Sequence, residues 1–195
     1  MKPIFTTVLL STLLGLSACV SSAPTSAQQQ AAPIAYTTGG FASVEIKQPV
    51  ATSFGILANV ALWPQINQGV TKAISPANIE VKVGNTFKES IASPVPGVKD
   101  WTNEWTIEEY QANRKLVIAG IDNFSSVPIH SRITYEFSPK DAHTTLFKRR
   151  IEVSLDEHFL AHAQKSEIEA LYRFLGSQSE MATHLKKYVE AHGKP

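Results

Sequence analysis

"HSRITYEFSPKDAHTTLFKRRIEVS", His130 to Ser154, is the stretch that decides the fold. Before the turn "SPKDAH", alternate positions are held by Ile133, Tyr135 and Phe137; after it, they are held by Phe147, Arg149, Ile151 and Val153. Residues two apart lie on the same face of a strand. Alternation on both sides of a short turn therefore predicts an antiparallel β-hairpin with one largely apolar face.

The same period of two extends upstream of the hairpin. "DWTNEWTIEEYQ", residues 100–111, places Trp101, Asn103, Trp105 and Ile107 on one face. "NRKLVIAGID", residues 113–122, is expected to form the next strand after a turn near Ala112 and Asn113. These patterns predict two further antiparallel strands beside the hairpin.

Residues 41–91 continue the strand pattern, with one interruption. "FASVEIKQ", residues 41–48, predicts the first strand, and "NIEVKVGNTFKESI", residues 78–91, predicts another in which Gly84 marks a bend or bulge. The turn-rich "SPVPGVKD", residues 93–100, then predicts a loop. Between the two strands, "PVATSFGILANVALWPQI", residues 49–66, shows helical spacing, and Pro64 is expected to end or break that helix.

A long helix is expected at the C-terminus, from about Lys165 to Ala191. Its apolar stripe consists of Ile168, Leu171, Leu175, Ala182, Leu185 and Val189. The order is a strand, a helical segment, several antiparallel strands and a closing helix. This order predicts an α+β fold in which the last helix crosses one face of a curved sheet.

The arrangement resembles the START-like helix-grip superfamily, also called SRPBCC, which includes polyketide cyclase/dehydrase-like proteins. The resemblance rests on "PVATSFGILANVALWPQI", "VKVGNTFKE", "WTNEWTIEEYQANRKLVIAG" and the closing helix. Asn59 departs from the Asp that many members carry before their Trp-Pro. The resemblance implies a curved antiparallel sheet wrapped around the C-terminal helix, with an apolar cavity between them.

Such a cavity would bind a hydrophobic small molecule or lipid. Its expected lining consists of Phe87, Trp105, Ile107, Ile133, Tyr135, Phe137, Phe147, Arg149, Ile151, Leu171 and Leu175. The same residues would also form an ordinary filled core. Asn103 and Arg149 interrupt the apolar faces, and a buried Arg needs a partner, which an anionic ligand head group could supply. A local bulge that turns Arg149 outward is the arrangement we expect.

Motifs of known enzyme chemistry are scarce. His158 and His162 stand four residues apart in "HFLAH", but Glu157 does not match the HExxH zinc pattern. The sequence contains neither a Gly-rich phosphate loop nor a G-x-S-x-G elbow. Glu108 and Glu109 would point to opposite faces of a strand. We therefore name no catalytic residue, no metal ligand and no cofactor.

The only cysteine, Cys19, ends the tetrapeptide "LSAC". A charged start, an apolar run from about Val8 to Leu16 and small residues before a cleavage point are typical of a signal peptide. "LSAC" resembles the bacterial lipobox, which implies cleavage after residue 18 and lipidation of Cys19. Val20 follows in place of Asp, which by resemblance to enterobacterial sorting favours the outer membrane, facing the periplasm.

Residues 19–40 carry no charge and are rich in Ser, Ala, Gln, Pro and Thr, so we expect a flexible tether before a single START-like domain over residues 41–195. The chain has 18 Lys and Arg against 17 Asp and Glu, and loss of Lys2 with the signal would leave 17 of each. "KRR", residues 148–150, would alternate between strand faces and so form no single patch. This balance argues against a nucleic-acid partner.

Together these observations favour a lipid-anchored envelope protein that binds a hydrophobic ligand, with the membrane as its other partner through Cys19. Two alternatives remain open: an enzyme of the cyclase/dehydrase type, and an interaction protein with a filled core. An acid–base pair inside the cavity would favour the enzyme, but the sequence patterns identify none. The identity of the ligand and the oligomeric state are left open.

Overall fold

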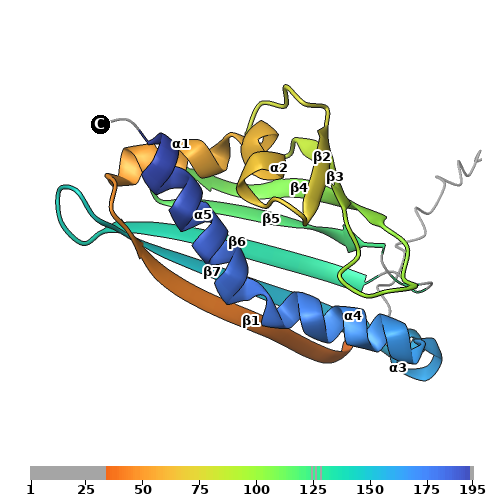
Figure 1. Cartoon of the computed structure of the whole chain (residues 1–195). Coiled ribbons are helices and arrows are strands. Elements are labelled where there is room, and N and C mark those ends of the chain that lie inside the picture. Colours follow the sequence, from red (N-terminus) through yellow and green to blue (C-terminus); the bar gives the residue numbers. More distant parts are fainter. Residues whose placement is uncertain (1–33, 124, 126, 128, 194–195) are drawn as a thin grey trace, which may run out of the picture. The chain divides into compact units, whose positions relative to one another are not determined.

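A computed structural model describes residues 34–193 apart from 124, 126 and 128. Within these residues, seven antiparallel strands form one curved sheet in the order β1-β7-β6-β5-β4-β3-β2 (Figure 1). The strands are β1 (Ile34–Ile46), β2 (Thr71–Ser75), β3 (Thr86–Ile91), β4 (Trp101–Gln111), β5 (Lys115–Asp122), β6 (Ile129–Pro139) and β7 (Thr145–Asp156).

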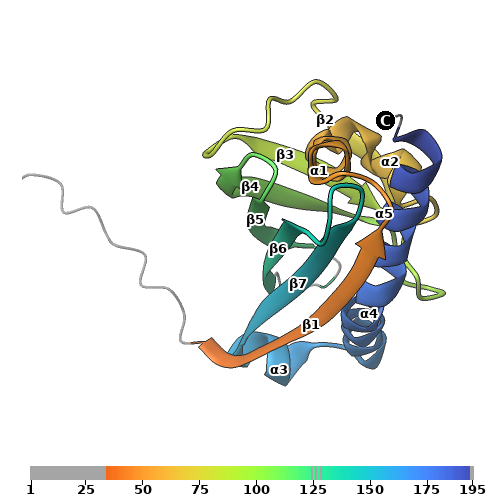
Figure 2. The same cartoon turned by 90° about the vertical axis from the view of Figure 1, so that its left-hand side faces the viewer.

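Helices lie on the concave face and at the ends of this sheet. They are α1 (Val50–Ala58), the short 3-10 helix η1 (Val60–Leu62), α2 (Trp63–Ile66), α3 (Glu157–His162), α4 (Lys165–Gly176) and α5 (Gln178–His192). The last of these, α5, packs against β1 and β7 and touches α1 and α2, so the sheet curves around it (Figures 1 and 2). No helix within the described residues is long and apolar enough to cross a membrane. The predicted α+β helix-grip fold is confirmed.

The β6–β7 hairpin has the predicted register and faces. Pairing runs without a shift from His130 opposite Ser154 to Pro139 opposite Thr145. Alternate residues are buried from Ile129 to Phe137 in β6 and from Thr145 to Leu155 in β7. In β4 the predicted inner residues Trp101, Asn103, Trp105 and Ile107 are all buried, while their neighbours are exposed. The period of two therefore predicted the inner face of these strands correctly.

The strand predicted over residues 78–91 is shorter than expected. Only β3 is a strand, and Val83 is 55% exposed. Gly84 adopts a φ of +89°, and Asn85 N–H bonds to the carbonyl of Lys82, so the chain turns here before β3 begins. Conversely, β2 was not predicted. With only five residues, it has too short an alternation to stand out.

The first strand begins earlier than expected. Residues 34–40, which the sequence assigned to the tether, belong to β1 and pair with β7 as far as Ile34 opposite Asp156. Their polar, Gly-containing composition carries little strand signal, but the long partner strand pairs with most of them, with a register shift between Ile34 and Tyr36. The predicted signal peptide, Cys19 and the rest of the tether lie outside the described residues.

The predicted helix over residues 49–66 is divided into α1, η1 and α2. Pro64 stands in the first turn of α2, where its missing N–H costs nothing, so it begins a helix and does not end one. The indole N–H of Trp63 donates to the carbonyl of Leu57 (2.8 Å), which joins the two helices through a buried hydrogen bond. Phe54 and Leu57 face the core as the spacing predicted.

The predicted C-terminal helix is two helices, because it breaks at Ser177. The carbonyl of Phe174 accepts hydrogen bonds from Ser177 Oγ (2.8 Å) and Gln178 Nε2 (2.7 Å), which compete with continuation of the helix. Helix kinks are common at such Gly-Ser pairs, here Gly176-Ser177. Of the predicted stripe, Leu171 on α4 is buried, whereas Ile168 near the start of α4 is 39% exposed.

Gly40 allows the junction of α4 and α5 to approach β1. A Cβ at this position would lie 2.6 Å from the carbonyl oxygen of Leu175 and 2.7 Å from Cγ of Gln178. The first neighbour is backbone and cannot rotate away. The helix pair therefore reaches the sheet only because residue 40 has no side chain.

We predict that Gly40→Ala lowers the free energy of unfolding by about 1–3 kcal/mol, since the added methyl forces the junction away from β1. Gly55→Ala is the matched control: no atom lies within 4 Å of a Cβ at residue 55, which is inside α1. Gly55→Ala should stabilise by about 0.5–1 kcal/mol through helix propensity. Urea denaturation of both variants measures this, and equal effects would refute the close approach.

Candidate functional site

A buried polar cluster lies on the concave face of the sheet. Three of its members stand on adjacent strands: Glu89 on β3 faces Asn103 on β4, and Asp122 ends β5, which pairs with β4. Asn103 is 0% and Asp122 is 1% exposed, and Glu89 is also buried. Burying polar groups costs free energy unless each finds a partner, so the partners of each group matter.

Glu89 has a complete set of hydrogen-bond donors. Thr71 Oγ1 on β2 donates to its Oε1 (2.6 Å), and the indole N–H of Trp105 on β4 donates to its Oε2 (2.9 Å). Burial nevertheless raises the pKa of Glu89, against the opposing effects of these two hydrogen bonds and of the Arg149 charge. This carboxyl therefore ties three strands together and favours its neutral form more than an exposed Glu does.

Asp122 is less fully satisfied. Ser131 Oγ on β6 donates to its Oδ2, but its Oδ1 has no hydrogen-bond partner among the described residues. Burial raises the pKa of Asp122 to about 7, and the nearby Glu89 adds to that effect, while Ser131, Arg149 and Asn103 oppose it. Asp122 is thus a buried carboxyl that changes its charge near neutral pH.

Arg149 lies inside the protein, contrary to the expected bulge. The register of β6 and β7 passes through Tyr135 opposite Arg149 without interruption, so alternation carries the side chain to the concave face, where it is 4% exposed. Its flanking residues Lys148 and Arg150 are exposed on the outer face. The pairing is regular on both sides of Arg149, so no bulge turns its side chain outward.

The guanidinium of Arg149 lies over the ring of Tyr135, 5.6 Å from the ring centroid. Its charge lowers the pKa of both Glu89 and Asp122, so the two carboxyls lie within its electrostatic reach. Within the described residues, however, Arg149 forms no ion pair with either of them. Burial raises the pKa of Tyr135 to about 12, so this phenol stays neutral beside the cation.

Four polar atoms of the cluster lack hydrogen-bond partners in the described part of the chain. They are Nδ2 and Oδ1 of Asn103, Oδ1 of Asp122 and Nη1 of Arg149. Asn103 lies close enough to Asp122 to lower its pKa, but its amide forms no hydrogen bond of normal geometry there. Buried polar atoms are rarely left unpaired in proteins, and such groups are candidates for binding a polar ligand group.

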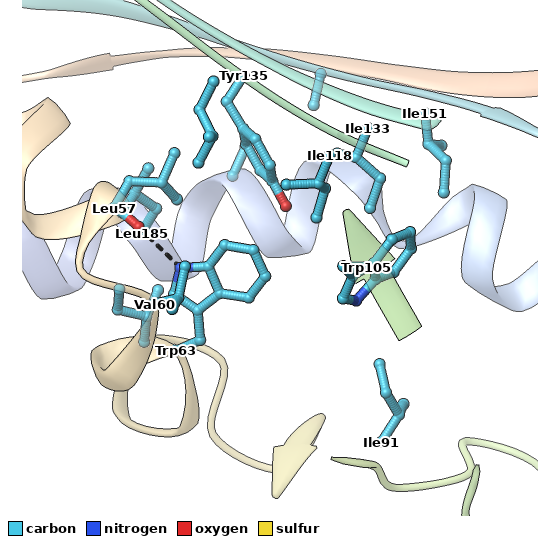
Figure 3. Close-up of a cluster of buried hydrophobic side chains, with 14 of the residues drawn as sticks. Leu57, Val60, Trp63, Ile91, Trp105, Ile118, Ile133, Tyr135, Ile151 and Leu185 are labelled. Atoms are coloured by element: carbon cyan, nitrogen blue, oxygen red, sulfur yellow. Dashed lines mark hydrogen bonds between the residues drawn. The ribbon is translucent and has the colours of Figure 1, made fainter. Parts of the chain in front are cut away.

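Of the residues predicted to line a cavity, Arg149 belongs to this cluster and the others belong to the apolar core. Of the eleven, all are buried except Leu175, which is partly buried and packs against the core. Tyr135, Trp63 and Trp105 point into the same interior region between the sheet and α5 (Figure 3). Phe147 stacks near Tyr135 with ring centroids 6.4 Å apart. The structure thus brings the predicted residues together, but whether they line a cavity or only fill the core stays a prediction.

Sequence reasoning did not select Glu89, Asp122 or Ser131. Their signal was present: Glu89 stands between Phe87 and Ile91 at a spacing of two, and Asp122 stands four residues after Ile118 on the same strand. A charged residue in phase with apolar neighbours points to the interior. Without the strand order, however, nothing in the sequence shows that these side chains meet.

Other candidate positions lie apart from the cluster. His158 and His162 are adjacent on α3, with ring centroids 4.3 Å apart, and the described residues contain no group of three or more side chains suited to a metal ion. Surface hollows of about 260 Å³ and 280 Å³ lie by Arg114 and Lys115 and between α2 and α5. A third, of about 400 Å³, lies beside β5 and β6 and includes Ser131.

Comparison with known proteins places this geometry in context. A family model described as "Activator of Hsp90 ATPase homolog 1-like protein" matches residues 59–190, more than half of the chain. No curated protein matches the chain in sequence. Among solved structures, the Zhui aromatase/cyclase from Streptomyces sp. R1128 is similar with a TM-score of 0.62 at 13% identity, over 82% of this chain and 97% of that one.

Two plant proteins show the same fold. Norcoclaurine synthase from Thalictrum flavum, in complex with dopamine and hydroxybenzaldehyde, has a TM-score of 0.56 at 14% identity, covering 97% of this chain and 100% of that one. Major latex-like protein 151 from Panax ginseng has a TM-score of 0.55 at 14% identity, covering 82% and 99%. At these identities the likeness shows the fold alone.

We predict a specific pH dependence of stability from Asp122. Its folded pKa is raised, so between about pH 4 and 7 the folded state holds a proton that the unfolded state has lost, and stability falls as pH rises through this window. Asp122→Asn should therefore match the wild type below about pH 4 and become more stable than it as pH rises to about 7, with the difference growing by up to about 1.4 kcal/mol per pH unit and then levelling off.

Thermal or urea unfolding of both proteins across this range measures the difference. Glu136→Gln is the control, because Glu136 is exposed on the outer face of β6. A stability difference between wild type and Asp122→Asn that does not change with pH would show that Asp122 titrates normally.

Proposed function

Because this chain belongs to the Activator of Hsp90 ATPase homolog 1-like family and has the helix-grip fold, we propose that it binds a hydrophobic small molecule between the sheet and its C-terminal helices. The observation that carries the proposal is the buried cluster of unpartnered polar atoms among aromatic and aliphatic side chains. A site of this kind combines apolar walls with a few polar groups that orient the ligand.

Proteins of the same fold support this proposal through what they bind or do. One is an aromatase/cyclase and another is a synthase in complex with two small aromatic compounds. In this chain the corresponding region offers Trp63, Trp105, Tyr135 and Phe147 as aromatic walls. Transfer of apolar ligand surface from water to such walls contributes about 25 cal/mol per Å², before the costs of association are subtracted.

Ligand access requires the helices to move relative to the sheet, since the interior side chains are buried against one another. The break at Ser177 supports such movement. It separates α4 from α5, so α4 can shift while α5 keeps its contacts with β1 and β7. Motions of packed helices of this kind take place on the microsecond to millisecond scale.

We also propose that the protein is a lipoprotein held at the outer membrane through Cys19. The lipobox-like "LSAC" supports this, and β1 begins at Ile34, 15 residues after Cys19. A segment of that length reaches at most about 50 Å when extended. The binding domain would therefore stay close to the membrane surface, where apolar ligands are concentrated.

An enzyme on the same scaffold is the second candidate. The observation that favours it is Asp122, a buried carboxyl near Glu89 whose pKa of about 7 suits proton transfer at neutral pH. The sequence patterns alone identified no such group. A binding protein would release its ligand unchanged, whereas an enzyme would release a product.

We predict that the purified full chain binds an apolar fluorescent probe with about one equivalent per chain, displaceable by a lipid or an aromatic compound. Ala182→Phe should weaken binding, because Ala182 is fully buried on α5 and the larger ring would occupy interior space. Thr183→Phe, the partly exposed neighbour, is the matched control. Absence of probe uptake by folded protein would overturn the binding proposal, and mass spectrometry of the recovered ligand separates binding from conversion.

We predict that Cys19→Ala abolishes lipid attachment, because the thiol that receives the lipid is gone. Cells expressing each version would be labelled with radioactive palmitate and then fractionated. Wild type should be labelled and sediment with membranes, while the variant should be unlabelled. Equal palmitate incorporation in both versions would contradict the lipoprotein proposal.

A further inference from the structure

Resting on the proposed function, we infer that the ligand is an amphiphile with a carboxylate head group, bound by Arg149 and Asn103 with its apolar body against the aromatic walls. The proposed function names only an apolar ligand. The polar cluster adds the chemistry of the head group, and three features of the structure carry this inference.

The first feature is the unbalanced charge of Arg149. Arg149 is 4% exposed and forms no ion pair within the described residues, and its Nη1 has no hydrogen-bond partner there. Arg stays protonated in proteins, so Arg149 itself carries a positive charge at every accessible pH. A buried charge without a counter-ion is strongly unfavourable, and an anionic ligand group would neutralise it.

The second feature is that the two nearby carboxyls are poor counter-ions. Burial favours the neutral form of both Glu89 and Asp122, and Glu89 already accepts hydrogen bonds from Thr71 and Trp105. A neutral carboxyl is also a hydrogen-bond donor. In that state Asp122 adds a donor to the cluster in place of a negative charge.

The third feature is the set of unpartnered donors. Nη1 of Arg149 and Nδ2 of Asn103 both lack partners among the described residues. A carboxylate accepts hydrogen bonds at two oxygens and donates none, so it matches this set better than a hydroxyl or an amine does. The planar guanidinium is held over Tyr135, which orients it for charge-assisted hydrogen bonds to such a group.

The exposed basic residues within the described part of the chain do not offer an equivalent site. The hollow by Arg114, Lys115 and Lys148 opens to solvent, and Lys115 is already paired with Glu109 at 2.8 Å. Water and salt screen such surface charges. Among the residues that the structure describes, the interior cluster alone combines a poorly screened cation with apolar surroundings for the body of an amphiphile.

Two ligands with the same chain and different heads test the inference. Isothermal titration of the purified full chain with dodecanoate and with dodecanol, both below their micellar concentrations, compares the heads directly. We expect dodecanoate to bind at least about tenfold more tightly. Arg149→Met should remove this preference, because it weakens dodecanoate binding much more than dodecanol binding.

Arg150→Met is the matched control. Arg150 is the next residue on β7 but is exposed and pairs with Glu152 on the outer face (2.9 Å), so its loss should leave the preference unchanged. Arg149→Lys keeps the charge and should retain a preference for dodecanoate. If Arg149→Met does not fold, the wild-type comparison and Arg149→Lys still decide the question.

The outcomes separate the two proposals. Equal binding of dodecanoate and dodecanol by wild type would overturn the carboxylate inference and leave the binding proposal intact. An equal loss of preference in Arg149→Met and Arg150→Met would also overturn it, because a surface charge would then be responsible. Binding of neither ligand by folded wild type would overturn the proposed function itself.

Discussion

The uninterrupted register of β6 and β7 is the constraint on which the rest of the structure depends. Because side chains alternate strictly along a strand, a continuous register between these two strands assigns every residue of both to the inner or the outer face. β1 pairs with β7 and β5 pairs with β6, so the division into inner and outer faces extends to these neighbouring strands. One shift of a single residue would have moved Arg149 to solvent and the aromatic side chains with it.

The cost of that constraint is a charged group in the interior. Replacing a buried charged cluster by apolar side chains is often neutral or stabilising in other proteins, so stability alone does not explain why Arg149, Asn103 and Asp122 are inside. Glu89 has hydrogen-bond partners and a structural role, since it links β2, β3 and β4 through Thr71 and Trp105. The groups without partners are those that a ligand would use. Sites where buried polar groups lack the partners that stability requires are often functional sites.

The helices are adapted to the sheet by small local features. Gly40 removes a side chain where β1 meets the helix junction, and Ser177 and Gln178 satisfy the carbonyl of Phe174 at the end of α4. The same junction that allows close packing also divides the closing helix into two parts. The close packing of the junction against β1 and the division of the closing helix into α4 and α5 therefore occur at the same place.

Much of the fold could be predicted from local patterns. The hairpin over residues 130–154, the inner face of β4 and the α+β order followed from the spacing of apolar residues, because solvent imposes that spacing on any half-buried strand or helix. Predictions failed where the signal was short or not local. β2 has only five residues, β1 depends at its start on a distant partner strand, and the break at Ser177 depends on side-chain hydrogen bonds.

The sequence by itself determined which faces of the main strands are apolar, and so which large side chains lie inside. It also contains the motif around Cys19 from which we propose a membrane anchor. Only the tertiary structure decided that Arg149 points inward, that Glu89, Asn103 and Asp122 stand on neighbouring strands, and that their pKa values are set by burial. The physical reason is range: hydrophobic periodicity acts over a few residues, whereas the partners of a buried polar group come from strands that are far apart in the chain.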